Sequence, residues 1–227
     1  MTIVSGVLVA LPTFAYAEAG TEDSDEHLEQ LGSAVDSLAR AGVLSPDQPR
    51  TGSGEFDVVD LGESFAEPTS EGNLVNVRIA VEDGLAIDAD TFGRFVMTTL
   101  RGERGWEEVE NVRFVLTGQD ADVTVFLASP ATVDELCAPL DTRGYTSCRV
   151  DDSVVLNVDR WAGATDDFLA AGGSLLQYRH YLVNHEVGHF LGHGHDTVCL
   201  PSGKAPVMMQ QTLDLSQCEP NGWPATQ

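Results

Sequence analysis

The chain has 227 residues, with 36 acidic and 12 basic side chains and a formal net charge of −24 at pH 7. This length suits one domain with appended segments or two small domains, and 42% hydrophobic residues is ordinary for a globular protein. Nucleic-acid binding and electrostatic docking on an anionic membrane both need a basic surface, so the charge excludes these two classes of partner.

The first 17 residues have the pattern of a secretory signal peptide. Residues 3–16 are almost free of polar groups, and Ala15-Tyr16-Ala17 is a small-x-small sequence suited to cleavage. No Lys or Arg precedes Arg40, so the basic n-region of this signal peptide is truncated; a buried N-terminal strand or helix is the alternative. We therefore expect a secreted protein that is not membrane-bound in its mature form.

Residues 18–71 carry 14 acidic and two basic side chains among scattered Gly, Ser and Pro. Such a composition buries too little apolar surface to offset the entropy of ordering the chain. Within it, His27–Ala41 has leucine and valine at helical spacing and can form a short amphipathic helix. The segment predicts an acidic linker, with a propeptide as the alternative, followed by a domain over residues 72–227.

From about Asn73 the hydrophobic pattern becomes regular. It predicts strands at Leu74–Val81, Val112–Leu116, Val123–Leu127 and Val154–Val158, and helices at Asp88–Leu100 and Leu175–Leu191. The order is strand, helix, three strands, helix and a loop-rich tail. It predicts an α+β domain with α/β-like character.

The four cysteines, Cys137, Cys148, Cys199 and Cys218, all fall in this domain. An even number in an exported chain predicts two disulfides, for which three pairings exist. Cys137–Cys148 and Cys199–Cys218 are the local pairing and close short loops on either side of the second helix. A zinc site is the competing use, but no pair has the C-x₂-C spacing of structural zinc ligands.

The segment HEVGHFLGHGHD, residues 185–196, carries the chemistry. His185 and His189 are four residues apart, so on a helix both imidazoles project from one face and can reach one metal ion. Gly192 permits a sharp turn that returns His195 to the same ion. Three ligands with one open position predict a catalytic Zn²⁺, and Glu186 lies where it can act as general base. A helix with ordinary buried histidines is the alternative.

H-E-x-x-H-x-x-G-x-x-H followed by a methionine-bearing turn resembles the signature of the metzincin metalloproteases. The turn candidate is APVMMQ, residues 205–210, in which Met208 is expected beneath the zinc site and Met209 is the alternative. The resemblance implies a mixed sheet with a backing helix, an active-site helix and a loop-rich C-terminal part. Asp196, beside the third ligand, is expected either to fix an imidazole tautomer or to lie exposed in a loop.

Residues 73–227 are also similar to a family of secreted actinobacterial metzincin-like proteins of unknown function. The segments that carry this similarity are VLNVDRW (155–161), YRHYLVN (178–184), APVM (205–208) and NGWP (221–224). One departure from better-known metzincins is that no tyrosine follows the methionine turn within reach of the metal. A tyrosine switch is therefore not expected here.

Metzincins bind an extended peptide along an edge strand beside the active-site helix. The strand expected in this role consists of Val154, Val155, Leu156, Asn157 and Val158. The expected function is a secreted, monomeric zinc peptidase acting on a protein or peptide substrate. A hydrolase of cell-wall peptides and a non-enzymatic, metal-stabilised extracellular domain are the alternatives; Glu186 beside an open metal position favours an enzyme.

Overall fold

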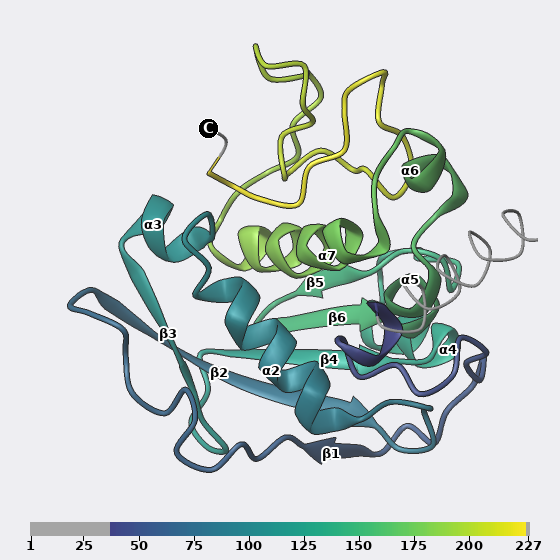
Figure 1. The fold of residues 1–227 in the computed structure, drawn as a ribbon. Helices are drawn as coiled ribbons and strands as arrows, with labels where there is room; N and C mark the ends of the chain where they lie inside the picture. Colours follow the sequence, from purple (N-terminus) through teal and green to yellow (C-terminus); the bar gives the residue numbers. More distant parts are fainter. Residues whose placement is uncertain (1–36, 226–227) are drawn as a thin grey trace, which may run out of the picture. The chain divides into compact units, whose positions relative to one another are not determined.

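The computed structural model describes residues 37–225 (Figure 1). The predicted signal peptide and most of the predicted helix His27–Ala41 lie outside the described residues; of that helix, residues 37–39 are helical. No helix in the described part has the length and apolarity needed to cross a membrane.

The described strands form one mixed sheet. They are β1 (Phe56–Val58), β2 (Asn73–Glu82), β3 (Val112–Leu116), β4 (Val123–Ala128), β5 (Cys148–Val150) and β6 (Ser153–Asn157). The order in the sheet is β1-β2-β4-β6-β5, and β3 pairs with the first half of β2. β2, β3, β4 and β6 run parallel, whereas β1 and β5 are antiparallel to their neighbours. The fold is therefore α+β, as predicted.

The described helices connect and cover these strands. They are α2 (Ala89–Leu100), α3 (Trp106–Glu110), α4 (Pro130–Leu136), α5 (Val158–Gly163), α6 (Asp166–Ala170) and α7 (Leu175–Phe190). The two long helices begin at side-chain caps: Asp88 accepts a hydrogen bond from the Thr91 amide, and Ser174 accepts one from the Gln177 amide. Both helices match the ranges predicted from the sequence to within about one residue.

Alternate residues of the central strands face opposite sides of the sheet. Val125 and Leu127 of β4, with Val154 of β6, belong to the main core, which α2 and α7 cover (Figure 1). Phe126 and Val155 point the other way into a smaller cluster beneath α4. The inner strands are buried on both faces, which explains their almost continuous hydrophobic sequences.

Residues 41–71 are part of the domain. Ala41, Val43, Val59 and Leu61 are buried in the main core, and β1 pairs with the end of β2. The boundary predicted at residue 72 therefore lies too late in the chain. These few apolar residues are irregularly spaced because they fill gaps on an existing core, so they produce no periodic signal.

The strand predicted as an edge is internal. β6 pairs with β4 on one side and with β5 on the other, and Val158 already begins α5. The edge on this side is β5, which returns to β6 through a tight turn. The prediction was wrong because β5 has only three residues, too few to show strand alternation.

The predicted disulfides are confirmed. Cys137–Cys148 joins the end of α4 to β5, and Cys199–Cys218 closes a loop within the tail after α7. The first bridge holds a ten-residue loop beside the sheet edge. The second encloses the predicted methionine turn.

Candidate metal centre

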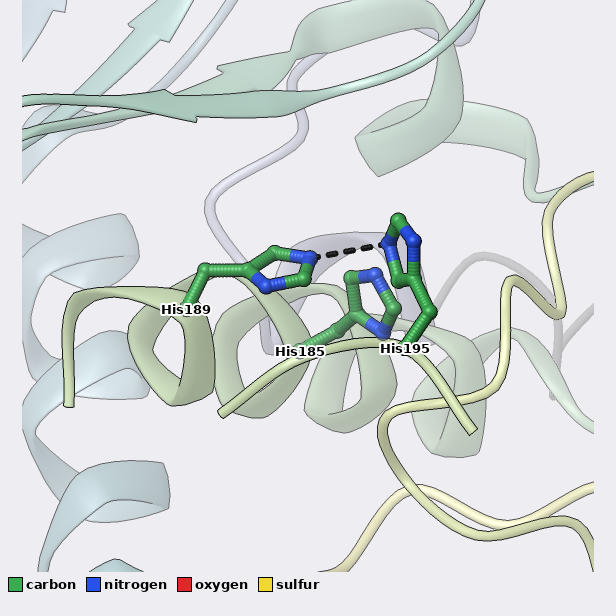
Figure 2. A group of neighbouring side chains, drawn as sticks. All are labelled: His185, His189 and His195. Atoms are coloured by element: carbon green, nitrogen blue, oxygen red, sulfur yellow. Dashed lines mark hydrogen bonds between the residues drawn. The ribbon is translucent and has the colours of Figure 1, made fainter. Parts of the chain in front are cut away.

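Three histidines converge at the C-terminal end of α7. His185 and His189 project from the same side of the helix, and His195 reaches them from the segment that follows (Figure 2). The helix ends after Phe190, and Gly192, with a φ of 98°, turns the chain back. One nitrogen from each ring lies within 4.8 Å of the others, so the predicted trio can hold a metal ion.

Backbone carbonyls orient two of these rings. His185 donates through Nδ1 to the Val207 carbonyl at 2.8 Å, and His189 donates through Nδ1 to the His193 carbonyl at 2.8 Å. A carbonyl oxygen only accepts, so each Nδ1 carries the hydrogen and each Nε2 is unprotonated; that of His189 accepts a hydrogen bond from His195 (Figure 2). Both rings therefore present to the centre the nitrogen that binds a metal.

The protonation states also suit a ligand set. Burial, opposed by the hydrogen bond to Val207 and reinforced by the neighbouring imidazoles, lowers the pKa of His185 to about 3. Burial and the neighbouring His189 lower the pKa of His195, and the carboxylate of Asp196 opposes this shift. Neutral imidazole is the form that coordinates metals, so proton competition at neutral pH is weak.

The spacing of the rings fits a small divalent ion. The Nε2 atoms of His189 and His195 are 3.0 Å apart. Two nitrogens at about 2.0–2.1 Å from a tetrahedral zinc ion are separated by about 3.3 Å. Imidazole donors suit zinc, copper, iron and nickel, so the ligand set alone leaves the metal's identity to experiment.

Glu186 follows the first ligand and lines the same cavity as the three histidines. Its side chain is buried, and burial raises its pKa to about 8. It is not among the side chains that converge as ligands. A carboxyl group that titrates near neutrality beside a metal site is suited to moving a proton.

The predicted methionine turn braces the centre mainly through its backbone. Val207 accepts the hydrogen bond from His185, and Met208 accepts one from the Asp196 amide at 3.1 Å. The Met208 side chain is buried against Gly188 of α7. Met209 is buried as well, but its amide closes a local turn onto Pro206. The turn thus connects the segments that carry the first and third histidines.

Asp196 is exposed, the second of the two expected placements. Among residues 37–225 its carboxylate makes no hydrogen bond, although it lies close enough to His195 to influence the pKa of that ring. The tautomers of His185 and His189 are instead set by the carbonyls of Val207 and His193. Sequence reasoning missed these partners because any residue type supplies a carbonyl.

A second group that sequence reasoning missed holds the loop of the third histidine. The His193 ring stacks on Trp106 with centroids 4.5 Å apart, and its Nε2 contacts the Glu110 carboxylate at 2.9 Å. Trp106 also donates to the Asn184 carbonyl of α7 at 2.8 Å. The short helix α3 therefore contacts both α7 and the loop that carries His193.

The histidines open into a cavity of about 1150 Å³. One wall is the loop closed by Cys137–Cys148 together with β5, and Tyr181, Thr212 and Leu213 also line the cavity. The only signal for this wall in the sequence was the pair of cysteines that bracket it. The volume is large enough for several peptide side chains.

A family model described as "Protein of unknown function (DUF3152)" matches residues 44–223. The match begins within the segment expected to be a linker and contains every residue of the metal centre. Neither the curated proteins nor the solved structures contain a match to this chain.

Proposed function

This chain belongs to the DUF3152 family, and we propose that it is a metzincin-like, zinc-dependent peptidase. The family's description assigns no activity, so the support for this proposal comes from the site. The proposal rests on the positions of four side chains. Three imidazoles converge beside the buried carboxyl of Glu186, and all four side chains line one cavity of about 1150 Å³.

His185, His189 and His195 would hold the ion through their ring nitrogens, and all three line the cavity that a substrate would enter. When bound, zinc supplies a Lewis acid that lowers the pKa of water to about 7 and polarises a carbonyl group. Glu186 accepts a proton at its carboxylate from the attacking water and returns it to the departing amine. The positive charge of the ion favours the ionised form of Glu186, which is the form that accepts the proton.

The sheet edge supports a peptide substrate. β5 ends the strand order and contributes Cys148 and Arg149 to the cavity that contains the histidines. An extended peptide adds to such an edge through backbone hydrogen bonds, and alternate side chains then enter the cavity. In this proposal β5 takes the substrate-binding role that the sequence assigned to residues 154–158.

The two disulfides support folding in an oxidising compartment, because thiols stay reduced in the cytosol. We therefore include secretion in the proposal. A peptidase acting outside the cell meets proteins and cell-wall peptides, which share the amide bond that this site is built to attack.

The test is to measure the metal content of the purified full chain and its cleavage of casein, a mixed peptide library and purified peptidoglycan, with Glu186→Gln as the matched variant. We expect one equivalent of zinc in both proteins and a loss of turnover of about 100- to 10,000-fold in the variant, the range typical of a removed general base. His189→Ala should lose both zinc and turnover.

Two results would contradict the proposal. Undiminished cleavage by the Glu186→Gln protein would remove this carboxylate from the mechanism. Zinc-loaded protein that leaves all three substrates intact would favour a non-enzymatic, metal-stabilised domain.

A further inference from the structure

Arg149 projects from the sheet edge toward the metal centre. It pairs in register with Val154, and directly opposite residues of an antiparallel pair share a face of the sheet. The Val154 side chain lies in the main core beneath α7, so Arg149 points to the α7 side. Accordingly, Arg149 lines the cavity together with His185 and Glu186.

The guanidinium of Arg149 has no protein partner in the described part of the chain. Its Nε is buried from solvent and makes no hydrogen bond. It belongs to none of the ion pairs of residues 37–225. The two terminal nitrogens of the same guanidinium are not fully buried, so a ligand in the cavity can reach this unpaired charge through them.

The second arginine of this cavity is different. Arg143 is highly exposed and pairs with the equally exposed Asp141 at 3.1 Å. Its charge is therefore compensated locally and screened by water. Arg149 is half-buried and uncompensated, in a chain whose net charge is −24 and which offers many carboxylates elsewhere.

From this contrast we infer that Arg149 is a specificity-determining residue that binds a carboxylate of the substrate. The planar guanidinium presents parallel N–H donors that match the two oxygens of a carboxylate, and partial burial strengthens that pair. The inference rests on the proposed function and narrows it to acidic peptides. A peptide bound along β5 would then place one of its carboxylates against the guanidinium of Arg149.

An alternative role for Arg149 is protection of the sheet edge. Charged side chains on edge strands prevent pairing between copies of a protein. That role requires the charge but no ligand, and it predicts self-association of a neutral variant. It makes no prediction about which peptides bind.

The carboxylate has two sources in a peptide, an Asp or Glu side chain and the free C-terminus. We would measure both by isothermal titration calorimetry with the zinc-loaded, full-length Glu186→Gln protein, which binds without turnover. The probes are acetylated alanine-based heptapeptides with one Asp at successive positions, each matched by an Asn peptide. Every peptide is made with an amidated and with a free C-terminus.

We expect the Asp peptide at one position, or the free C-terminus, to bind at least about 10-fold more tightly than its neutral match. Adding Arg149→Gln should abolish this preference for the acidic peptide. Arg149→Lys keeps the positive charge but loses the parallel N–H donors, so it should retain part of the preference. Adding Arg143→Gln is the control and should preserve the ratio. Circular dichroism and zinc content confirm that each variant is folded.

Equal affinity for all acidic and neutral peptides would overturn the inference, as would a preference that survives Arg149→Gln. Self-association of Arg149→Gln without any change in the binding ratio would identify edge protection instead. Because the assay needs no cleavage, an inactive wild-type protein would refute the proposed peptidase while leaving this test of Arg149 readable.

Discussion

Gly188 stands on α7 between His185 and His189 and faces two side chains from other parts of the fold. A Cβ atom at this position would lie 2.4 Å from the sulfur of Met208 and 2.7 Å from the ring of Trp106. Carbon atoms in ordinary contact are about 3.5–4.0 Å apart. The methionine turn and α3 therefore reach this turn of the helix because position 188 has no side chain.

Replacing Gly188 with Ala should destabilise the protein by about 1–3 kcal/mol, the range for overpacking a filled core, although alanine is the better helix former. Zinc affinity should fall as well, because Met208 and Trp106 both shift. Thermal unfolding and zinc titration measure the two effects. Gly163→Ala is the matched control, since a Cβ there meets nothing within 4 Å. A Gly188→Ala protein equal to the wild type in both measurements would contradict this account.

The three histidines of the metal centre could be predicted from the sequence, whereas the residues that hold them in place could not. His185, His189 and His195 follow from residue type and spacing, because imidazoles four residues apart on a helix share a face. Trp106 lies about 80 residues earlier in the chain, and no local pattern connects it to the motif. Contacts between distant segments exist only after folding.

Whether a helix or strand could be predicted from the sequence depended on its length. The strands of five or more residues and the helices α2 and α7 lie within about one residue of the predicted ranges. β1, β5 and α3 to α6 were not predicted, because three-residue strands and helices of five to seven residues repeat the strand or helix period too few times to give a signal. Because β5 was not predicted, β6 was wrongly expected to be an edge strand.

Glu82 joins two of these elements to the segment before β1. It ends β2, and its buried carboxylate accepts hydrogen bonds from the Ser129 amide at 2.6 Å, the Thr132 hydroxyl at 2.6 Å and the Gly54 amide at 2.9 Å. Burial alone raises the pKa of Glu82, but these hydrogen bonds outweigh it and lower the pKa below the usual 4.5. The charged carboxylate thus fastens the segment before β1 to the sheet and to α4.

This shift makes stability depend on pH. Because the folded pKa is lowered, the stabilisation from Glu82 is complete above about pH 4.5 and is lost as the pH falls through the folded pKa. Glu82→Gln should unfold about 1–3 kcal/mol more easily at pH 7, since its amide would face the Ser129 donor, and should lose less stability below pH 4.5. Urea unfolding at several pH values tests this. Glu71→Gln, at an exposed position, should match the wild type, and equal acid sensitivity of the Glu82 variant would exclude the mechanism.

In the described part of the molecule, residues 41–71 contribute to the hydrophobic core and do not form the separate linker that the sequence predicted. Their irregular, acidic sequence resembles a solvated linker, and only the positions of Ala41, Val43, Val59 and Leu61 show otherwise. A composition average over 54 residues hides four well-placed side chains. Their burial is a property of the assembled fold, which the sequence pattern does not contain.

A fragment of residues 72–227 should therefore fail to fold, whereas residues 37–227 should unfold cooperatively. The shorter fragment lacks β1 and the four buried side chains, of which Val43, Val59 and Leu61 are each worth about 1.5–3 kcal/mol, against a total stability of about 5–15 kcal/mol. Expression, circular dichroism and thermal unfolding of both fragments measure this. Cooperative unfolding of residues 72–227 at the same temperature as the longer fragment would show that the segment is dispensable.

The two disulfides should have different functional effects, although each closes a short loop and stabilises the fold by about 3 kcal/mol. Cys137→Ser with Cys148→Ser frees the cavity wall and should raise KM while zinc is retained. Cys199→Ser with Cys218→Ser frees the segment that contains the methionine turn and should weaken zinc binding. Steady-state kinetics and zinc titration separate these effects. Identical losses in both double variants would contradict the assignment of one bridge to the wall and the other to the turn.

The brevity of β5 has a consequence for which targets the proposed enzyme reaches. A peptide that adds to three residues of strand edge must present an extended backbone with free N–H and C=O groups. Segments inside the helices and sheets of a native protein have these groups already paired. Attack on a folded target then waits for local unfolding, and its rate follows the equilibrium of that opening. Flexible linkers, chain termini and damaged proteins would be cleaved first, before any side-chain preference is exercised.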